Sequence, residues 1–509
     1  MSGIFINSDA WNFWLSPTEM MNADGIRADV DFYTDRGGVE AIFYNMNFQR
    51  SFYNTRVGTP IWKDCEVLDD GTLLMRGKPV DAANDAAVYA GMIRNALELH
   101  KNCPDFMAER YRYCREKGVE MWHSMRMNDV HHTPLGKEHR PQHCDLWLDR
   151  KDLIRAWYRH TWRGEWIDNA LDYGNPEVYA YHLAMAEEYL MDFESDGIEL
   201  DWLRCAPVFK PGFDEMNTPI LTRFMQDVRR IADKAEQKWG HRIRIAVRVP
   251  GVVTEAMGMG MDVHTWVKEN LIDVLIPGPR DTSTEQGYNI GLWRIIAPEP
   301  VIIAPCIDYD MSSNPLSWGQ VFCNETDCGF ASNFYEQGAD TIYLYNHFPR
   351  HLKDHADMQE FFAIAADPEK VAAHRRRHVL TRHAHNGEGQ FPVLCYPHQI
   401  WSNCCNGGVK INAGQNTQGR RARIVVGATV PLDIDVLLNT ELCRMLPEDT
   451  PLPGYMPWKT GVKTYFVQAE IPAGVLHDGW NVVEFFHKGN FTIHAHELIW
   501  TEIAIDAAE

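Results

Sequence analysis

The sequence predicts an α/β fold in which a (β/α)8 TIM barrel is followed by a C-terminal β-sandwich domain. Within residues 1–350, short apolar runs typical of buried parallel strands alternate with longer patterns typical of amphipathic helices. In the last part of the chain, short segments alternate apolar with polar residues and are separated by Gly, Pro and Asn turns. A chain of 509 residues is also longer than one ordinary domain, which favours one large and one smaller domain.

Eight apolar runs are the predicted barrel strands. They cover residues 3–7, 39–47, 119–129, 197–202, 242–250, 273–278, 301–306 and 340–346. Helical patterns lie between most of them, such as 105–118, 176–195 and 219–240, where proline at the start and glycine after the end fit helix boundaries. Eight strand–helix units are the number that closes a TIM barrel. We expect the long insertions at 49–83 and 133–172 to form loops over the carboxyl-terminal face of this barrel.

The change of pattern sets the predicted domain boundaries. We assign residues 1–350 to the TIM barrel, 351–378 to a helical bridge and 379–509 to the β-sandwich domain. Segments such as RARIVVGAT and WNVVEFFHKG carry the alternating strand pattern of the last part.

Composition and charge exclude several classes of protein. The net charge of -21 argues against a nucleic acid partner, because neutralising phosphates requires a basic face. No apolar run approaches the roughly 20 residues that span a bilayer, so we expect no membrane association. The first residues, MSGIFINSDAW, show no basic segment followed by a long apolar one, so we expect a cytoplasmic protein unless a leader was trimmed.

The cysteines indicate reduced thiols in a large core rather than a disulfide framework, because the 12 of them are spread through the chain. Cys323 with Cys328, and Cys404 with Cys405, lack the paired spacing of a zinc site. We therefore expect no metal and no cofactor.

The most informative motif is MWHSMRMNDVHH, in which a run fit for a buried strand ends in a cluster of polar residues. The cluster consists of Arg126, Asn128, Asp129, His131 and His132. Burying a cation, a carboxylate and two imidazoles together costs several kcal/mol unless they are paired. The alternative is a structural role, in which these polar groups pair with one another at the end of the strand. We favour a functional site.

Other predicted strands also end in polar residues. Catalytic groups of a TIM barrel lie at the carboxyl ends of its strands. These ends supply Asp9, Asn45, Glu199, Asp201, Arg204, Arg248 and Asn346. Carboxylates, amides and arginines in one pocket suit a hydroxylated, partly anionic sugar, since guanidinium forks pair with a carboxylate and planar amides pair with hydroxyls.

Two pairs of residues are candidates for the acid and base of glycoside cleavage. That reaction needs an acid near the leaving oxygen, and either a nucleophile or a base that activates water. Glu199 and Asp201 stand two apart on one strand and point the same way. The rival pair, Asp9 and His131, comes from the first and third strands. Spacing alone does not choose between them.

The combination of SDAW, RMNDVHH, DGIELDWLR and LYNHF resembles the inverting exo-sialidases of glycoside hydrolase family 156 over the whole length, barrel plus sandwich. The resemblance implies hydrolysis of terminal α-linked sialic acid by single displacement, with Asp9 as base and His131 as acid. It also implies that Arg126 and Arg204 hold the carboxylate of the sialoside substrate, that Asn346 contacts the sugar, and that the protein is a homodimer. Further candidate substrate-binding residues are Asn45, Asp129, Asp201 and Arg248.

His132 lies directly beside His131, so the assignment of the acid stays open, and we favour His131. Adjacent strand residues face opposite ways, so only one of the two imidazoles points to the pocket if the strand geometry persists. A histidine suits a sialoside, because its protonated form is attracted to the substrate carboxylate and becomes neutral on donating its proton. Asp129 is a candidate to hold the second imidazole nitrogen and fix its tautomer.

Three functions compete at this point. The first is an inverting exo-sialidase, and the second is another TIM-barrel glycoside hydrolase that uses Glu199 and Asp201 on neutral glycans. The third is a different class, either a non-catalytic sugar-binding barrel or a metal-dependent hydrolase. A metal hydrolase is disfavoured because INSDAW contains no His-x-His ligand pair. Binding alone is disfavoured because two candidate acid–base groups exceed what binding needs.

Overall fold

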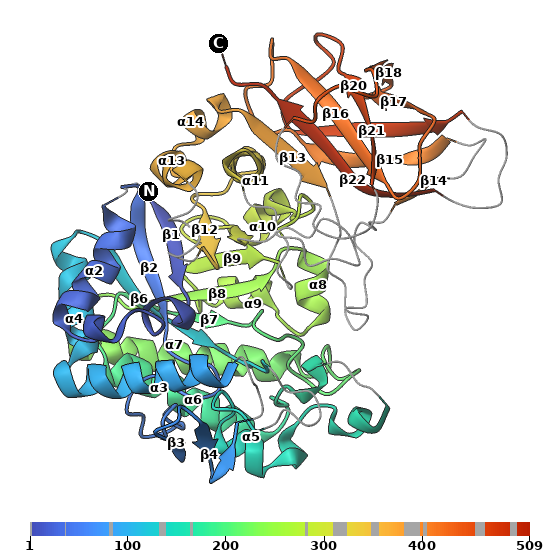
Figure 1. The fold of residues 1–509 in the computed structure, drawn as a ribbon. Helices are drawn as coiled ribbons and strands as arrows, with labels where there is room; N and C mark the ends of the chain where they lie inside the picture. Colours follow the sequence, from blue (N-terminus) through green and yellow to red (C-terminus); the bar gives the residue numbers. More distant parts are fainter. Residues whose placement is uncertain are drawn as a thin grey trace.

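The computed structural model describes residues 3–35, 37–80, 85–131, 139–162, 166–279, 284–308, 323–347, 356–380, 398–400, 405–453, 464–488 and 496–508. Within these residues, a nine-stranded parallel sheet covered by helices is followed along the chain by two antiparallel sheets of six and four strands (Figure 1). The predicted TIM barrel with a C-terminal β-sandwich domain is confirmed.

The barrel strands follow the predicted apolar runs. They are β1 (Ile4–Ser8), β2 (Val39–Asn45), β6 (Glu120–Arg126), β7 (Gly197–Asp201), β8 (Arg244–Pro250), β9 (Val274–Gly278), β10 (Ile302–Ile303), β11 (Cys306–Asp308) and β12 (Tyr343–Tyr345). Their order in the sheet is β10-β9-β8-β7-β6-β2-β1-β12-β11, and all pairs are parallel.

The two ends of the sheet are β10, which lies within the predicted strand 301–306, and β11, which begins at the last residue of that strand. β10 pairs with β9 on one side, whereas β11 pairs with β12 on the other. Between the two parts, the Ala304 N–H donates to the Leu275 carbonyl and the Tyr343 N–H donates to the Pro305 carbonyl. Pro305 has no N–H for a ladder bond, which explains why the strand is interrupted there.

Helices connect successive strands and cover the outside of the barrel. They are α2 (Ala23–Thr34), α3 (Asp85–Asn102), α4 (Phe106–Glu116), α6 (Pro176–Asp192), α7 (Thr218–Trp239), α8 (Val253–Gly258), α9 (Val263–Lys268), α10 (Ile290–Ile296) and α11 (Asn324–Glu336). The predicted boundaries hold at α6, where Asn175 accepts a cap bond from the Glu177 N–H and Pro176 is the first residue, and at α7, where Gly240 ends the helix at φ 81°.

Short elements fill the connections. They are α1 (Ala10–Phe13), α5 (Asp145–Asp149), the 3-10 turns η1 (Thr18–Met20), η2 (Lys151–Leu153), η3 (Trp157–Trp162) and η4 (Trp166–Asn169), and a small sheet of β3 (Cys65–Val67), β4 (Leu73–Met75) and β5 (Lys78–Pro79). The small sheet lies within the long insertion after β2.

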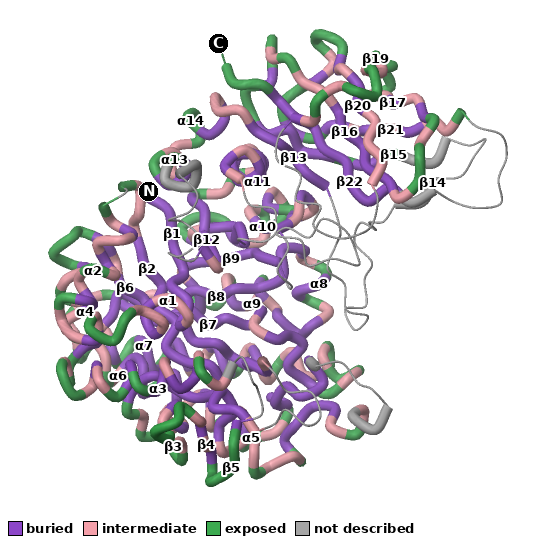
Figure 2. Tube along the Cα trace, viewed as in Figure 1, coloured by how far each residue is buried: buried purple, intermediate pink, exposed green. Residues whose placement is uncertain are grey.

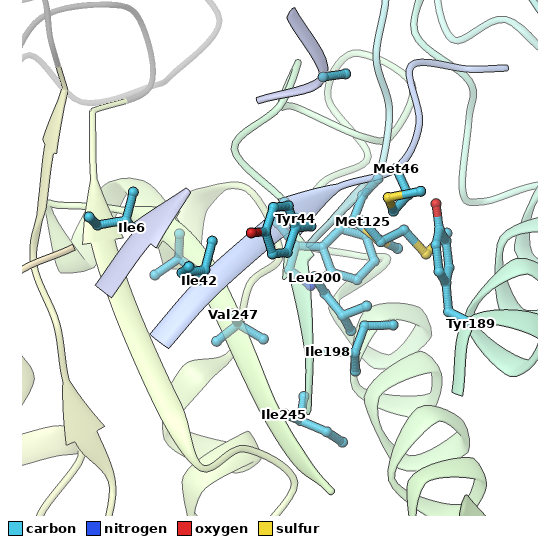
Figure 3. Close-up of a cluster of buried hydrophobic side chains, with 14 of the residues drawn as sticks. Ile6, Ile42, Tyr44, Met46, Met125, Tyr189, Ile198, Leu200, Ile245 and Val247 are labelled. Atoms are coloured by element: carbon cyan, nitrogen blue, oxygen red, sulfur yellow. The ribbon is translucent and has the colours of Figure 1, made fainter. Parts of the chain in front are cut away.

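Side chains along the barrel strands alternate between two cores. Ile6, Ile42 and Leu200 belong to the large core between strands and helices (Figure 3). Phe43 and Trp122 belong to a separate buried cluster inside the barrel, where their rings stack at 4.8 Å between centroids. Strand side chains alternate with period two, so the polar residues two and four positions after Phe43 and Trp122 also face the barrel interior.

Two antiparallel sheets form the C-terminal sandwich. One contains β13 (Arg376–Leu380), β22 (His496–Ile505), β16 (Ala422–Ala428), β20 (Tyr465–Glu470) and β19 (Arg444–Met445), with β14 (His398–Ile400) also paired to β22; the other contains β15 (Cys405–Asn412), β21 (Trp480–His487), β17 (Ile434–Leu438) and β18 (Glu441–Leu442). Val409, Ile424, Val436 and Ile503 share one buried cluster, which shows that both sheets enclose a common core.

The sandwich packs on the barrel through α11, and the two parts share a buried boundary (Figure 2). Gly329 of α11 lies so close to the Arg377 carbonyl of β13 that a Cβ atom would overlap it. α13 (Ala356–Ile364) and α14 (Pro368–Ala373) occupy the predicted bridge, and β13 begins at Arg376, ahead of the predicted start at 379. The division into domains stays a prediction. None of the described helices is long and apolar enough to cross a membrane.

Candidate active site

The middle of the barrel interior is a polar layer around Glu199. Asn7 of β1 donates from Nδ2 to Ser124 Oγ at 3.1 Å and to the Tyr343 hydroxyl at 2.9 Å, and that hydroxyl donates to Glu199 Oε1 at 2.8 Å. Glu199 is fully buried. Burial, and after it the charge of Asp201, raises the pKa of Glu199 to about 7. This carboxyl group is therefore enclosed in the barrel interior and hydrogen-bonded to Tyr343.

Asp201 and Arg248 form an ion pair one layer nearer the carboxyl ends of the strands. Register places Asp201 beside both Arg126 and Arg248. Arg248 donates from Nε to Asp201 Oδ1 at 2.9 Å and from one terminal nitrogen to Oδ2 at 3.0 Å, and its guanidinium lies 3.9 Å from the centroid of the Tyr345 ring. Asp201 is 1% and Arg248 is 3% exposed. Each satisfies the charge of the other, so the rival acid–base pair of Glu199 and Asp201 is enclosed.

Arg126 joins the predicted base to the predicted acid motif. Its side chain is 1% exposed, and its guanidinium donates one hydrogen bond to Asp129 Oδ2 at 2.9 Å and another to Asp9 Oδ2. The ring of Phe48 lies 5.2 Å from the guanidinium carbon. A planar cation with forked donors is the side chain that can bridge two carboxylates in this way. Arg126 thus holds residues from the first and third predicted strands together.

Asp9 is positioned by the turn that begins α1. Its Oδ1 accepts from the Trp11 N–H at 2.8 Å, which makes it the N-cap of that short helix, while its Oδ2 accepts from Arg126. Asp9 is 3% exposed. Each carboxylate oxygen has two acceptor positions, so each can accept one further hydrogen bond from water.

His131 and Arg204 are the partly exposed members of the same network. Asp129 Oδ1 lies 2.7 Å from His131 Nδ1 and also accepts from the His131 backbone N–H at 3.0 Å. Arg204 contacts His131 Nε2 through a terminal nitrogen, and its Nε lies 3.7 Å from Asp129 Oδ2. The His131 side chain is 28% exposed and that of Arg204 is 19% exposed, whereas Asp129 is buried. The His131 imidazole and the Arg204 guanidinium are therefore the most solvent-exposed groups of this network.

Buried charges set the ionisation of this network. Burial opposes ionisation of Asp129, but His131, Arg126 and Arg204 together hold its pKa well below the ordinary range. Burial lowers the pKa of His131, and the charge of Asp129, which raises it, does not outweigh burial together with Arg204 and Arg126. The structure therefore holds a carboxylate at Asp129 and a neutral imidazole at His131 near neutral pH.

The other predicted site residues lie around this network. Arg204 donates its backbone N–H to Asp201 Oδ1 at 3.1 Å, which connects the network to the layer below. Asn45 is buried and donates to the Ser124 carbonyl at 3.3 Å. Asn346 adopts φ 59°, which asparagine tolerates, and its Nδ2 lies 3.3 Å from Asp308 Oδ1.

The structure thus joins Asp9, Arg126, Asp129, His131 and Arg204 directly, whereas Asn45 and Asn346 bond to other partners. His132, the alternative acid, lies outside the described residues.

Two residues that support His131 were not identified from the sequence. The ring of Phe48, which faces Arg126, also lies 6.4 Å from the His131 ring. His143 lies 3.0 Å from the His131 carbonyl through Nε2 and is 1% exposed. The position of Phe48 between the polar strand-end residues Asn47 and Gln49 was a signal in the sequence. His143 lies in the insertion 133–172, and no pattern there marks it.

No group of three or more His, Cys, Asp or Glu side chains suited to a metal ion occurs among the residues that the structure describes.

Comparisons with known proteins give distant structural likenesses. No protein-family model matches the chain, and no curated protein matches it. A maltogenic α-amylase from Thermotoga neapolitana has TM-score 0.37 and 8% identity, covering 96% of this chain and 99% of its own. A family GH18 chitinase from Chromobacterium violaceum has TM-score 0.37 and 10% identity, covering 100% and 91%.

A cycloisomaltooligosaccharide glucanotransferase from Paenibacillus has TM-score 0.33 and 10% identity, covering 98% of this chain; the chain spans 57% of that protein. At these values the likenesses say nothing about what this chain binds or cleaves.

Proposed function

We propose that this protein is a glycoside hydrolase, and within that class an exo-sialidase that releases terminal α-linked sialic acid from glycoconjugates by inverting single displacement. The observation that carries the proposal is the network at the carboxyl ends of β1, β6 and β7. There, Arg126 bridges Asp9 to Asp129, and Asp129 holds His131, whose other ring nitrogen contacts Arg204. The resemblance of these motifs to family 156 supports the same roles.

His131 is the proposed acid. Asp129 at Nδ1 fixes the ring, so Nε2, on the side of Arg204, is the nitrogen left to protonate a leaving group. A carboxylic acid that gave up its proton beside the anomeric carboxylate of a sialoside would create a second negative charge there. A histidinium becomes neutral on donating, so it avoids that repulsion.

Asp9 is the proposed base, which acts on water. It accepts from one terminal nitrogen of Arg126, while Asp129, which holds His131, accepts from the other. An inverting enzyme needs its base apart from its acid, so that a water molecule fits on the far side of the sugar, and Arg126 stands between Asp9 and Asp129 in this network. Asp9 keeps an acceptor position on each oxygen for that water.

Arg204 and Arg126 are the proposed clamp for the substrate carboxylate. Arg204 is partly exposed and lies beside the proposed acid, so its guanidinium is the one that an anion from solvent can contact. Arg126 is buried and already binds two aspartates, so it acts mainly through its charge. Asn346, Asn45, Asp201 and Arg248 stay proposed substrate-binding residues, and the homodimer stays a prediction.

The direct test is the anomer released from α-sialyllactose, followed by proton NMR within the first turnovers. Inversion produces the β-anomer of sialic acid first, with the α-anomer growing only by mutarotation. EDTA is expected to leave the rate unchanged, and Asp9→Asn and His131→Gln are expected to abolish release while remaining folded by circular dichroism. Initial release of the α-anomer would contradict the mechanism, and no release from any sialoside would contradict the substrate.

A further inference from the structure

Arg204 lies against the nitrogen that the proposed acid must use. One terminal nitrogen of its guanidinium contacts His131 Nε2, and the same nitrogen lies 3.5 Å from Nδ1. The opposite side of the ring is held by Asp129, whose Oδ1 lies 2.7 Å from Nδ1. His131 is therefore held between a carboxylate and a guanidinium.

The chemistry of the two partners fixes the protonation state of the ring. Arginine only donates hydrogen bonds, so a protonated Nε2 would set one donor against another, and the contact with Arg204 favours an Nε2 without a proton. A carboxylate only accepts, so Nδ1 must carry the proton toward Asp129. The imidazole in this arrangement is neutral, and the position from which a leaving group would be protonated is occupied by a cation.

His131 has charged, aromatic and backbone neighbours. Among the described residues, the charged side chains that act on it are Asp129, Arg126 and Arg204. Phe48 presents an uncharged ring, and His143 contacts the backbone carbonyl of His131 rather than its imidazole. Arg204 is the partly exposed cation of the set, so it is the one that a ligand can reach.

We propose that Arg204 is a specificity-determining residue that keeps His131 unprotonated until an anionic sugar binds, so that only carboxylate-bearing substrates switch on the acid. This inference rests on the proposed function. A substrate carboxylate pairs with the Arg204 guanidinium in bidentate fashion and draws its donor away from Nε2. The negative charge of the bound carboxylate then favours the imidazolium, and Nε2 takes a proton from solvent.

The proton balance of the cycle follows from these steps. The proton taken up on binding moves from Nε2 to the glycosidic oxygen as the bond from that oxygen to the anomeric carbon breaks. Water attacks the anomeric carbon and loses a proton to Asp9, and that proton returns to solvent with the product. A neutral sugar of equal size does not engage Arg204, so it leaves Nε2 occupied and the leaving group without a proton donor.

Calorimetry measures the uptake directly. Binding of N-acetylneuraminic acid and of its methyl ester is titrated at pH 7.5 in phosphate and in Tris, and the buffer dependence of the heat gives the number of protons taken up. We expect uptake approaching about one proton for the acid and none for the ester. Arg204→Met should abolish the difference between the two ligands, and Arg230→Met, on the exposed face of α7, should retain it. Equal uptake for both ligands in the wild type overturns the proposal.

A second measurement separates this inference from the proposed function. The ligand-free protein carrying ¹³C-labelled histidine is titrated by NMR, with the His131 signal assigned from its loss in His131→Gln. Removing the cation in Arg204→Met should raise the titration midpoint of His131, whereas Arg230→Met should leave it in place. An unchanged midpoint in Arg204→Met overturns the proposal, whatever the protein binds. If neither sialic acid nor its ester binds, the proposed function fails and the midpoint alone decides the role of Arg204.

Discussion

Replacing Arg126 by methionine tests whether the bridge between Asp9 and Asp129 organises the site. The change removes one buried guanidinium and leaves two buried carboxylates without it. Methionine keeps a flexible chain of similar length against the ring of Phe48, so the loss of charge and hydrogen bonds dominates. Arg126→Lys is the matched variant, because it keeps the charge but places it on a single nitrogen.

The structure sets the expected size of both effects. Arg126 makes two charge-assisted hydrogen bonds, one to each carboxylate, and such bonds are worth about 1.5 to 3 kcal/mol each. Removing one partner of a buried ion pair typically costs about 3 to 5 kcal/mol, so Arg126→Met should lower the free energy of unfolding by that amount. Lysine cannot span both aspartates, so Arg126→Lys should lose about 1.5 to 3 kcal/mol.

Urea unfolding at pH 7.5, followed by the fluorescence of the 17 tryptophans and by circular dichroism, measures these differences. Arg230→Met is the control, since its ion pair with Asp227 is on the surface and the Arg230 side chain is 65% exposed. It should change stability by less than about 1 kcal/mol. If Arg126→Met unfolds with the free energy of the wild type and of this control, the bridge does not hold the site together and the reasoning is refuted.

Two other expectations concern the acid, the base and the enclosed glutamate. His131→Ala should lower kcat/KM for natural sialosides about 100- to 10,000-fold more than for an aryl sialoside, because a phenolate leaves without protonation. Asp9→Ala should lower kcat/KM for both substrates alike. If His131→Ala lowers kcat/KM equally for both, His131 is not the acid. Burial and the charge of Asp201 raise the pKa of Glu199 to about 7 in the folded state, whereas the unfolded chain releases this proton near 4.5. The free energy of unfolding should therefore fall as pH rises from about 4.5 to about 7 and stay level above that range. Glu199→Gln should remove that fall in unfolding free energy, and parallel curves for the two proteins would contradict this.

Helix and strand positions could be predicted because their signals are local. The apolar runs predicted at 3–7 and 197–202 became the barrel strands Ile4–Ser8 and Gly197–Asp201, and Pro176 marked the start of a helix. The same alternation placed Asp9 and Arg126 at the carboxyl ends of their strands, where barrel sites lie. Identity and spacing of neighbouring residues suffice for such statements.

The partners of the polar residues could not be predicted in the same way. Arg126 and Arg204 were expected to share one role, yet the first bridges two buried aspartates while the second lies on the imidazole. Asp201 was a candidate for catalysis, and in the structure it is bound by Arg248.

The sequence by itself determined the barrel, the sandwich and the set of ionisable residues at the strand ends, because period-two alternation and helix boundaries depend on neighbours in the chain. Only the tertiary structure decided which of these residues reach solvent and which satisfy one another. His131 and Asp9 stand 122 positions apart, and the described contacts link them through Asp129 and Arg126, whose register against β7 depends on how the strands align around the barrel. Pairing energy between charges depends on distance and burial, and both arise from packing between strands rather than from order along one strand.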